Sequence, residues 1–239
     1  MKKVIQGIDQ SLARAILGDN FLFGPEEWSM FHQINFSKRQ LRAVARFPWG
    51  EEILNAPCPF NEGKAVRETH VAFLGLNRFL GKRLSIRQWQ KIYPATSQPR
   101  FSSYDSWYTY ERFARRRTCG FRWYLMLKYI IPGSGGEDVY GRVRSLPAQY
   151  ERPFAVEEVT KHLLYYRKNG TYPGYTYGRT RDYIFHGQYF GDFSWSARAI
   201  LVGGSRGIDL SFMETDMNSF YSGLTQKIGA TASLLLPPK

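Results

Sequence analysis

Apolar residues recur at helical spacing in several separate segments of the chain. The longest such segment is 155–168, where Val156, Val159 and Leu163 would share one face and Gly170 follows the end. Four turns of this spacing with a terminal glycine predict a helix that packs one face against a core. By the same reasoning, shorter helices are predicted at 11–17, 37–47, 85–93 and 106–117, and a helix start at 24–28.

Other segments alternate in the manner of strands. Between residues 66 and 74, Val71 and Phe73 would lie on one face and Glu68 and His70 on the other. Alternation with period two predicts a strand that is buried on one side. A continuous apolar strand is predicted at 121–131, and after Gly170 come short β segments separated by turn residues, at 183–189, 198–202 and 208–212.

These elements predict an α+β protein. A helical N-terminal extension would occupy residues 1–48, and a single α+β domain would occupy residues 49–239. Within that domain we expect a mixed α/β middle and a β-rich C-terminal third, because the helical spacing stops at Gly170.

Composition agrees with a folded, soluble protein. The 239 residues are 43% hydrophobic and 16% aromatic, which is enough apolar material for an ordinary core. No run of about eighteen apolar residues occurs, and the N-terminus lacks a secretory apolar segment. We therefore expect a cytoplasmic location and no insertion into a membrane.

The net charge of +13 is confined to the middle of the chain. Residues 78–181 hold 20 basic and 7 acidic residues, a net of +13, whereas residues 1–77 carry +1 and residues 182–239 carry −1. Such a concentration of charge predicts an anionic partner.

In this middle segment, arginines alternate with aromatic residues. Cations that neutralise phosphates beside rings that stack on bases are the two elements of sequence-tolerant nucleic-acid binding. The predicted phosphate contacts are Arg112, Arg115, Arg116, Arg117 and Arg122, and the predicted stacking rings are Trp107, Tyr108 and Trp123. The alternative is that these arginines form the solvated C-terminal end of a helix, where positive charge is also favourable.

A second hypothesis concerns Cys58, His70 and Glu68. If 66–74 is a strand, Glu68 and His70 lie two residues apart on one face, where a carboxylate can orient an imidazole. Cys58 would then be the nucleophile and His70 its base, as in a hydrolase or transferase. The alternative is structural, with Cys58 as a small buried apolar residue.

Metal and cofactor sites are not indicated. The four histidines are scattered without metal-ligand spacing, and the two cysteines do not form a Cys-x-x-Cys pair. We expect neither a metal nor a cofactor.

Several short blocks resemble a group of uncharacterised bacterial proteins from chlamydia-like and candidate-phylum bacteria. The blocks are Cys58-Pro59-Phe60, Glu68-Thr69-His70 and Ile131-Pro132-Gly133-Ser134. The resemblance covers about residues 50–230 and implies a shared fold without an established activity, and a fold alone does not transfer function. This chain differs in the basic character of its middle and in its C-terminal Gln226-Lys227-Ile228-Gly229.

The sequence therefore favours a non-enzymatic binding protein that contacts an anionic partner, DNA or RNA, through its basic, aromatic-rich middle. A Cys/His-dependent hydrolase or transferase is one alternative. A protein-interaction module that uses the C-terminal loops is another.

Overall fold

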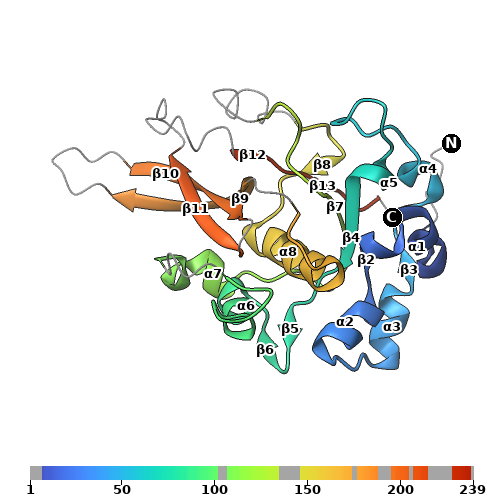
Figure 1. Cartoon of the computed structure of the whole chain (residues 1–239), viewed down its shortest axis with the longest axis horizontal. Helices are drawn as coiled ribbons and strands as arrows, with labels where there is room; N and C mark the ends of the chain where they lie inside the picture. The colour runs from blue at the N-terminus through green and yellow to red at the C-terminus, as the bar shows by residue number, and fades with distance from the viewer. Residues whose placement is uncertain are drawn as a thin grey trace.

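The computed structural model describes residues 7–101, 107–134, 146–173, 177–187, 195–204, 207–214 and 228–237. It contains helices and strands in a mixed arrangement (Figure 1). The α-helices of the described residues are α1 (Gln10–Leu17), α2 (Pro25–His32), α3 (Lys38–Val44), α4 (Glu51–Leu54), α5 (Val66–Thr69), α6 (Ile86–Ile92), α7 (Arg112–Arg116) and α8 (Ala155–Asn169). Two 3-10 helices are η1 (Asp19–Phe21) and η2 (Trp107–Tyr110).

The larger sheet of the middle region has five strands in the order β2-β4-β7-β13-β8. Strand β2 runs parallel to β4, and the other neighbours are antiparallel. Both β4 and β7 are buried along their whole length, which places them at the centre of the core. The five strands are β2 (Leu22–Phe23), β4 (His70–Leu74), β7 (Trp123–Leu127), β8 (Tyr150–Glu151) and β13 (Ser233–Leu234).

A second sheet is built from the C-terminal part of the chain in the order β11-β10-β9-β12. Its first three strands are antiparallel, and β12 is added parallel to β9. Two small pairs, β1 with β3 and β5 with β6, complete the described strands. These strands are β9 (Tyr177–Gly187), β10 (Trp195–Gly203), β11 (Asp209–Glu214), β12 (Ile228–Ala230), β1 (Ile8–Asp9), β3 (Arg46–Phe47), β5 (Arg78–Phe79) and β6 (Lys82–Arg83).

Helix α8 lies at the centre of the molecule, in contact with both sheets and with α6 and α7 (Figure 1). Its ends are set by local hydrogen bonds. A carboxylate oxygen of Glu157 accepts from the backbone N–H of Phe154 at 2.8 Å, and Gly170 adopts a left-handed φ of 73° that terminates the helix. Since every residue of the helix from Ala155 to Tyr165 is buried, α8 is a core helix rather than a surface helix.

Two tryptophans, one on α2 and one on α6, join these helices to the core. The indoles of Trp28 on α2 and Trp89 on α6 stack at 5.8 Å between centroids. The Trp28 N–H donates to the carbonyl of Leu74 at 2.7 Å, and the Trp89 N–H donates to Thr160 Oγ1 at 3.1 Å. These bonds connect α2 to β4 and α6 to α8.

Most predicted elements are present, and the mixed α/β character is confirmed. The segment predicted as a strand at 66–74 is only half correct, because Val66–Thr69 forms α5 and the strand begins at His70. The apolar segment at 121–131 forms the shorter strand β7. The described part of segment 106–117 is divided into η2 and α7, because Glu111 has extended backbone angles.

The boundary proposed at residue 48 stays a prediction. Residues before it contribute β2 to the five-stranded sheet and Trp28 to the core. The described strands of the C-terminal third agree with the segments predicted there, and residues 188–189 of the first of them lie outside the described residues.

Candidate functional site

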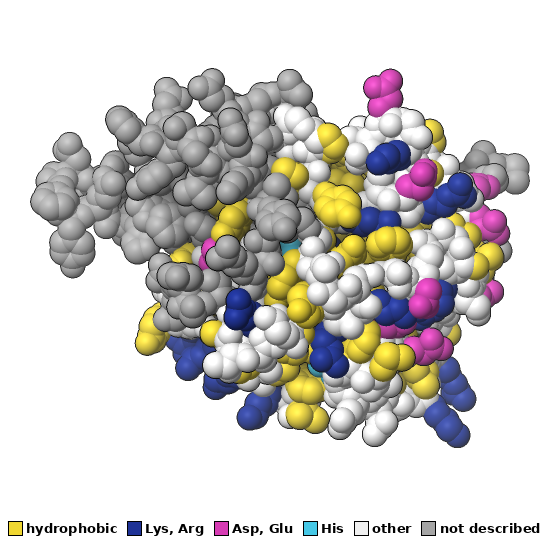
Figure 2. Space-filling model, viewed as in Figure 1, with side chains coloured by type: hydrophobic (Ala, Val, Ile, Leu, Met, Phe, Trp, Pro, Cys, Tyr) yellow, Lys and Arg dark blue, Asp and Glu magenta, His cyan; other side chains and the backbone are white. Residues whose placement is uncertain are grey.

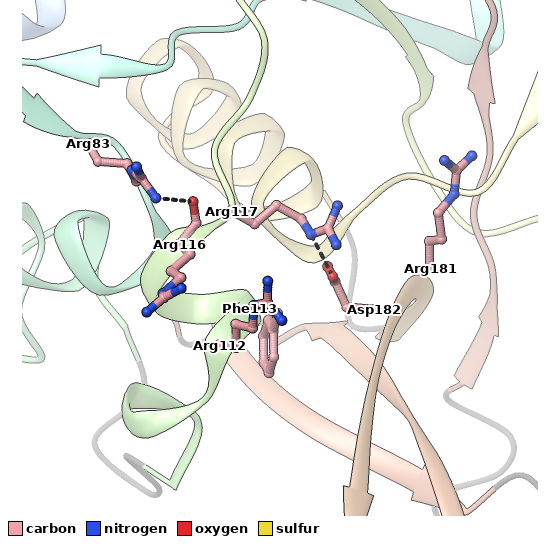
Figure 3. A pocket seen from close by; sticks show the side chains of 7 residues that line it. All are labelled: Arg83, Arg112, Phe113, Arg116, Arg117, Arg181 and Asp182. Atoms are coloured by element: carbon pink, nitrogen blue, oxygen red, sulfur yellow. Dashed lines mark hydrogen bonds and ion pairs between the residues drawn. The ribbon is translucent and has the colours of Figure 1, made fainter.

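A basic hollow opens between α7, the end of β6 and the middle of β9 (Figure 3). Its volume is about 710 Å³. We call it the arginine cleft, and it is lined by Arg83, Arg112, Phe113, Arg116, Arg117, Arg181 and Asp182. Five guanidinium groups therefore face one carboxylate.

Helix α7 presents three arginines to solvent while two neighbours anchor it. Phe113 and Ala114 are buried, and Arg112, Arg115 and Arg116 are exposed. Spacings of three and four residues bring these side chains to one face of the helix. Arg112, Arg115 and Arg116, with the ring of Tyr110, also line a second hollow of about 310 Å³ that adjoins the cleft.

The three α7 guanidinium groups have no carboxylate within ion-pair distance among the residues that the structure describes. Positive charges at this spacing repel one another on an isolated helix. Their charge is therefore available to an external anion.

The opposite wall of the cleft is neutralised internally. Arg117 Nε lies 2.9 Å from Asp182 Oδ1, and the Arg117 guanidinium lies 3.7 Å from the centre of the Phe154 ring. Arg181 approaches the same ring at 4.7 Å and forms an ion pair with Glu151. Burial raises the pKa of Asp182 above its ordinary value, and hydrogen bonding and the nearby arginines oppose that shift.

Arg83 links the β5–β6 pair to α7. Its Nη1 donates to the backbone carbonyl of Arg116 at 3.2 Å (Figure 3). Orphan carbonyls at a helix C-terminus commonly take such donors. The bond fixes the end of β6 against the last turn of α7.

Arg122 differs from the other predicted phosphate contacts. Its guanidinium lies 4.8 Å from the centre of the Tyr124 ring and 3.8 Å from a carboxylate oxygen of Glu151. It is not among the residues that line the arginine cleft. Its charge is therefore already partly compensated.

Two of the three predicted stacking rings are buried. Tyr108 is 1% exposed, and Trp123 is 4% exposed with its N–H donated to the carbonyl of Val44. Trp107 is partly buried, with its ring edge-to-face with that of Tyr108 at 5.7 Å. Neither Tyr108 nor Trp123 can offer a free face to a base.

The exposed ring of η2 is that of Tyr110, which lies in the segment 106–117 predicted as a single helix. Tyr110 is 82% exposed and lies beside the α7 arginines. The only sequence signal for it was the alternation of rings and arginines.

Figure 2 shows the same asymmetry over a wider area. Lys and Arg side chains gather along the lower left edge of this face, where Figure 1 places α6, α7 and β6. Most Asp and Glu side chains of the view lie on the right, over the N-terminal elements. Lys and Arg side chains also occur on the right of the view, where Asp and Glu side chains lie among them, whereas the lower left edge shows Lys and Arg without them.

The residues of the catalytic hypothesis have other roles in the fold. Glu68 belongs to α5, and its Oε2 accepts from the backbone N–H of Ala65 at 2.7 Å. His70 is fully buried, with Nδ1 within 2.9 Å of Thr69 Oγ1 and 3.1 Å of the carbonyl of Val66. Glu68 therefore caps a helix and does not orient the imidazole.

Cys58 and His70 are both buried. Cys58 is 5% exposed, and its sulfur lies 3.8 Å from the side-chain nitrogen of Asn61. Burial lowers the pKa of His70 to about 3, although the carbonyl of Val66 opposes this shift. A general base is most effective when its pKa is near the working pH, so His70 in this state is poorly suited to activate a thiol.

Among the described residues, no three His, Cys, Asp or Glu side chains gather into a potential metal site. None of the helices in these parts of the chain is both long and apolar enough to cross a membrane. Much of the loop region proposed as an interaction surface, at 188–194, 205–206 and 215–227, lies outside the described residues.

The chain matches no protein-family model, no curated protein and no solved structure. The resemblance to uncharacterised bacterial proteins therefore stays a prediction.

Proposed function

We propose that this chain is a non-enzymatic nucleic-acid-binding protein whose arginine cleft holds phosphate groups. The observation that carries the proposal is the set of three exposed α7 guanidinium groups, which have no carboxylate partner within the described parts of the chain. Burial of Phe113 and Ala114 fixes the helix that presents them. Guanidinium groups bind phosphate oxygens through planar pairs of hydrogen bonds, so Arg112, Arg115 and Arg116 are suited to this ligand.

A polymer suits this surface better than a single small anion. The α7 arginines line two adjoining hollows, of about 710 and 310 Å³, and Arg83 extends the positive charge beyond the helix. The exposed ring of Tyr110 adds a surface on which one base can stack. A strand that crosses both hollows would place successive phosphates on guanidinium groups and a base on the ring.

The two other functions are less well supported. A hydrolase or transferase that uses Cys58 would need a base, and His70 is buried with a depressed pKa. An interaction module would use loops that lie outside the described residues. The binding protein is favoured because Arg112, Arg115 and Arg116 are exposed and form no ion pair with any carboxylate that the structure describes.

Binding across a range of salt concentrations tests the proposal. Fluorescence anisotropy would follow a labelled 20-nucleotide single-stranded RNA, and its DNA equivalent, from about 50 to 300 mM salt. Each phosphate neutralised on a single strand contributes about 0.7 to the slope of log K against log salt. Affinity that does not fall with salt would exclude an electrostatic site.

A matched pair of variants locates the site. Arg112→Gln/Arg115→Gln removes two charges three residues apart on α7, and Arg39→Gln/Arg42→Gln removes two at the same spacing on α3, well separated from α7 in Figure 1. We expect the α7 variant to reduce the slope by about 1.4 and the α3 variant to leave it unchanged. Equal effects of the two variants would show that only net charge matters and would overturn the site.

A further inference from the structure

We propose that the β5–β6 hairpin inserts the side chain of Leu80 between neighbouring bases of the nucleic acid that the arginine cleft holds. The inference rests on the proposed function and adds the way in which this surface engages bases. We call residues 78–83 the basic hairpin, because they comprise Arg78, Phe79, Leu80, Gly81, Lys82 and Arg83.

The tip of the basic hairpin carries an unexpected residue. Arg78 pairs with Arg83 and Phe79 with Lys82, which leaves Leu80 and Gly81 as a two-residue turn. Both have left-handed backbone angles, with φ of 47° for Leu80 and 75° for Gly81. Turns of this type strongly prefer Asn, Asp or Gly at their first central position.

Neither the backbone nor packing explains a leucine at this position. A left-handed conformation costs an ordinary L-residue roughly 1–2 kcal/mol. Leu80 is also 82% exposed, so its side chain gains little from burial in the free protein. A large apolar group held in water at a strained position is suited to a partner that buries it.

The basic hairpin is anchored at its base and can therefore hold Leu80 in a defined position. The Phe79 ring meets His32 edge-on at 5.9 Å. Leu84, just after the hairpin, is 1% exposed and its N–H donates to the carbonyl of Asn77 at 3.0 Å. A group that is already positioned loses less conformational entropy when it binds.

Charge and position connect the tip to the cleft. The basic hairpin has three cationic residues and no acidic one. Arg83 lines the arginine cleft and donates to the carbonyl of Arg116. Leu80 lies at the tip of the same hairpin, two residues beyond the Arg78–Arg83 pair. That is on the order of 7 Å along a strand, so a phosphate chain bound at Arg83 passes within reach of Leu80.

Insertion of an apolar wedge between bases is a known form of recognition. The wedge unstacks one base step at a cost of a few kcal/mol, which the basic groups around it offset by holding the backbone.

A lipid surface would also attract a basic hairpin with an apolar tip. Nucleic acid is favoured because the adjoining guanidinium groups line a hollow, which a flat membrane surface cannot enter.

The substitution Leu80→Asn tests the wedge without threatening the fold, because Asn tolerates the left-handed conformation that Leu80 adopts. The probe is a 20-nucleotide single strand with 2-aminopurine in place of adenine, whose emission rises when neighbouring bases unstack. Met30→Gln is the matched control, since Met30 is another exposed apolar residue, 68% exposed, on α2.

We expect the unaltered protein and Met30→Gln to raise 2-aminopurine emission on binding. Leu80→Asn should abolish this rise and weaken binding about tenfold or more, as expected from the loss of one buried leucine. The thermal midpoint of Leu80→Asn should equal or exceed that of the unaltered chain, because the turn is less strained.

The other outcomes are distinct. If Leu80→Asn retains both the emission change and the affinity while the α7 variant loses binding, the wedge is wrong and the proposed function stands. If the unaltered protein binds no oligonucleotide, the proposed function and the wedge both fail. Leu80-dependent binding to phosphatidylserine vesicles without binding to oligonucleotides would assign the basic hairpin to a lipid surface and overturn the proposal.

Discussion

Arg117 Nε lies 2.9 Å from Asp182 Oδ1 at the edge of the arginine cleft. The other carboxylate oxygen of Asp182 accepts from the backbone N–H of Ala155 at 2.7 Å. A carboxylate at the first turn of a helix is favourable, because the unpaired N–H groups there carry partial positive charge. One buried side chain thus connects β9, the start of α8 and the cationic wall of the cleft.

Asp182→Asn should lower the stability of the protein and raise the affinity of the arginine cleft for a single strand. The amide oxygen of asparagine can still accept from Ala155, but the interaction with the positive charge of Arg117 is lost. We expect the free energy of unfolding in urea to fall by about 1.5–3 kcal/mol, the range for a hydrogen bond that involves charged groups. Affinity for the single strand should rise, because the lining loses its carboxylate.

The control for this variant is Glu26→Gln, which removes an exposed carboxylate on α2. It should change neither the stability nor the affinity beyond small surface effects. A fall in affinity with Asp182→Asn would contradict the expectation and would show that Asp182 holds Arg117 in its binding position.

Tyr110→Ala tests whether the exposed ring stacks on a base. Loss of one base stacked on an aromatic ring costs about 1–3 kcal/mol of binding free energy, so affinity should fall about tenfold. The slope of log K against log salt should stay the same, because no phosphate contact is removed. Stability should change little, since Tyr110 is 82% exposed.

Tyr129→Ala is the comparison for Tyr110→Ala. Tyr129 is 54% exposed and is not among the residues that line either basic hollow. Its removal should leave the affinity as it was. An unchanged affinity for Tyr110→Ala, or an equal loss in both variants, would argue against stacking at Tyr110.

The sequence predicted best the elements whose pattern depends only on neighbours along the chain. Helix α8 has an apolar repeat, an acidic first turn and a terminal glycine, and these signals are local. The segment 66–69 was predicted wrongly because its side chains make local bonds that alternation does not reveal. Glu68 caps the backbone of Ala65, and Thr69 donates back to its carbonyl, so a helical turn forms before the strand.

The location of the charge along the chain was also predictable, but its pairing was not. Arg112 and Arg117 look alike in sequence, yet Arg117 meets Asp182, a residue 65 positions away that the fold brings beside it. One continuous helix over 106–117 would place Tyr110 on the same face as the buried Phe113 and Ala114. Glu111 interrupts that helix, and in η2 Tyr110 is 82% exposed whereas Tyr108 is 1% exposed.

Glu157 should make the stability of the protein depend on pH. Burial raises the pKa of its carboxyl from 4.5 to about 7, while the N–H of Phe154 opposes the shift. The folded state thus holds this proton more tightly than the unfolded state. The protonated Glu157 side chain therefore stabilises the folded protein fully below about pH 4.5, and this contribution is lost as the pH rises through about 7.

Glu157→Gln should remove this dependence, because a neutral amide can accept from Phe154 at every pH. Urea unfolding of both proteins between pH 4.5 and 8 measures the difference in their free energies of unfolding. As the pH rises over this range, the difference should shift in favour of the variant by an amount on the order of 3 kcal/mol. The buried His32 and His162 have pKa values lowered to about 4, so they destabilise the folded protein as the pH falls. This effect is the same in both proteins and cancels in the comparison. A pH-independent difference would mean that Glu157 has an ordinary pKa.

The two free thiols should react slowly in the folded protein. Cys58 is 5% exposed and Cys119 is 1% exposed, and burial raises the pKa of the Cys119 thiol. A thiol reagent at pH 8 reacts with the thiolate and needs access to it, so both residues should be modified only through opening of the structure. We expect rates at least about a hundredfold lower than in urea, for the same reason.

Single Cys58→Ser and Cys119→Ser variants assign the rate to each sulfur. Rapid modification of Cys58 in the folded chain would contradict its burial, and His70→Gln would then decide the cause. If that second substitution slows the reaction, the imidazole activates the thiol and the hydrolase or transferase alternative gains support. If His70→Gln leaves the rate unchanged, local opening of the structure exposes Cys58, and the role of Cys58 is structural.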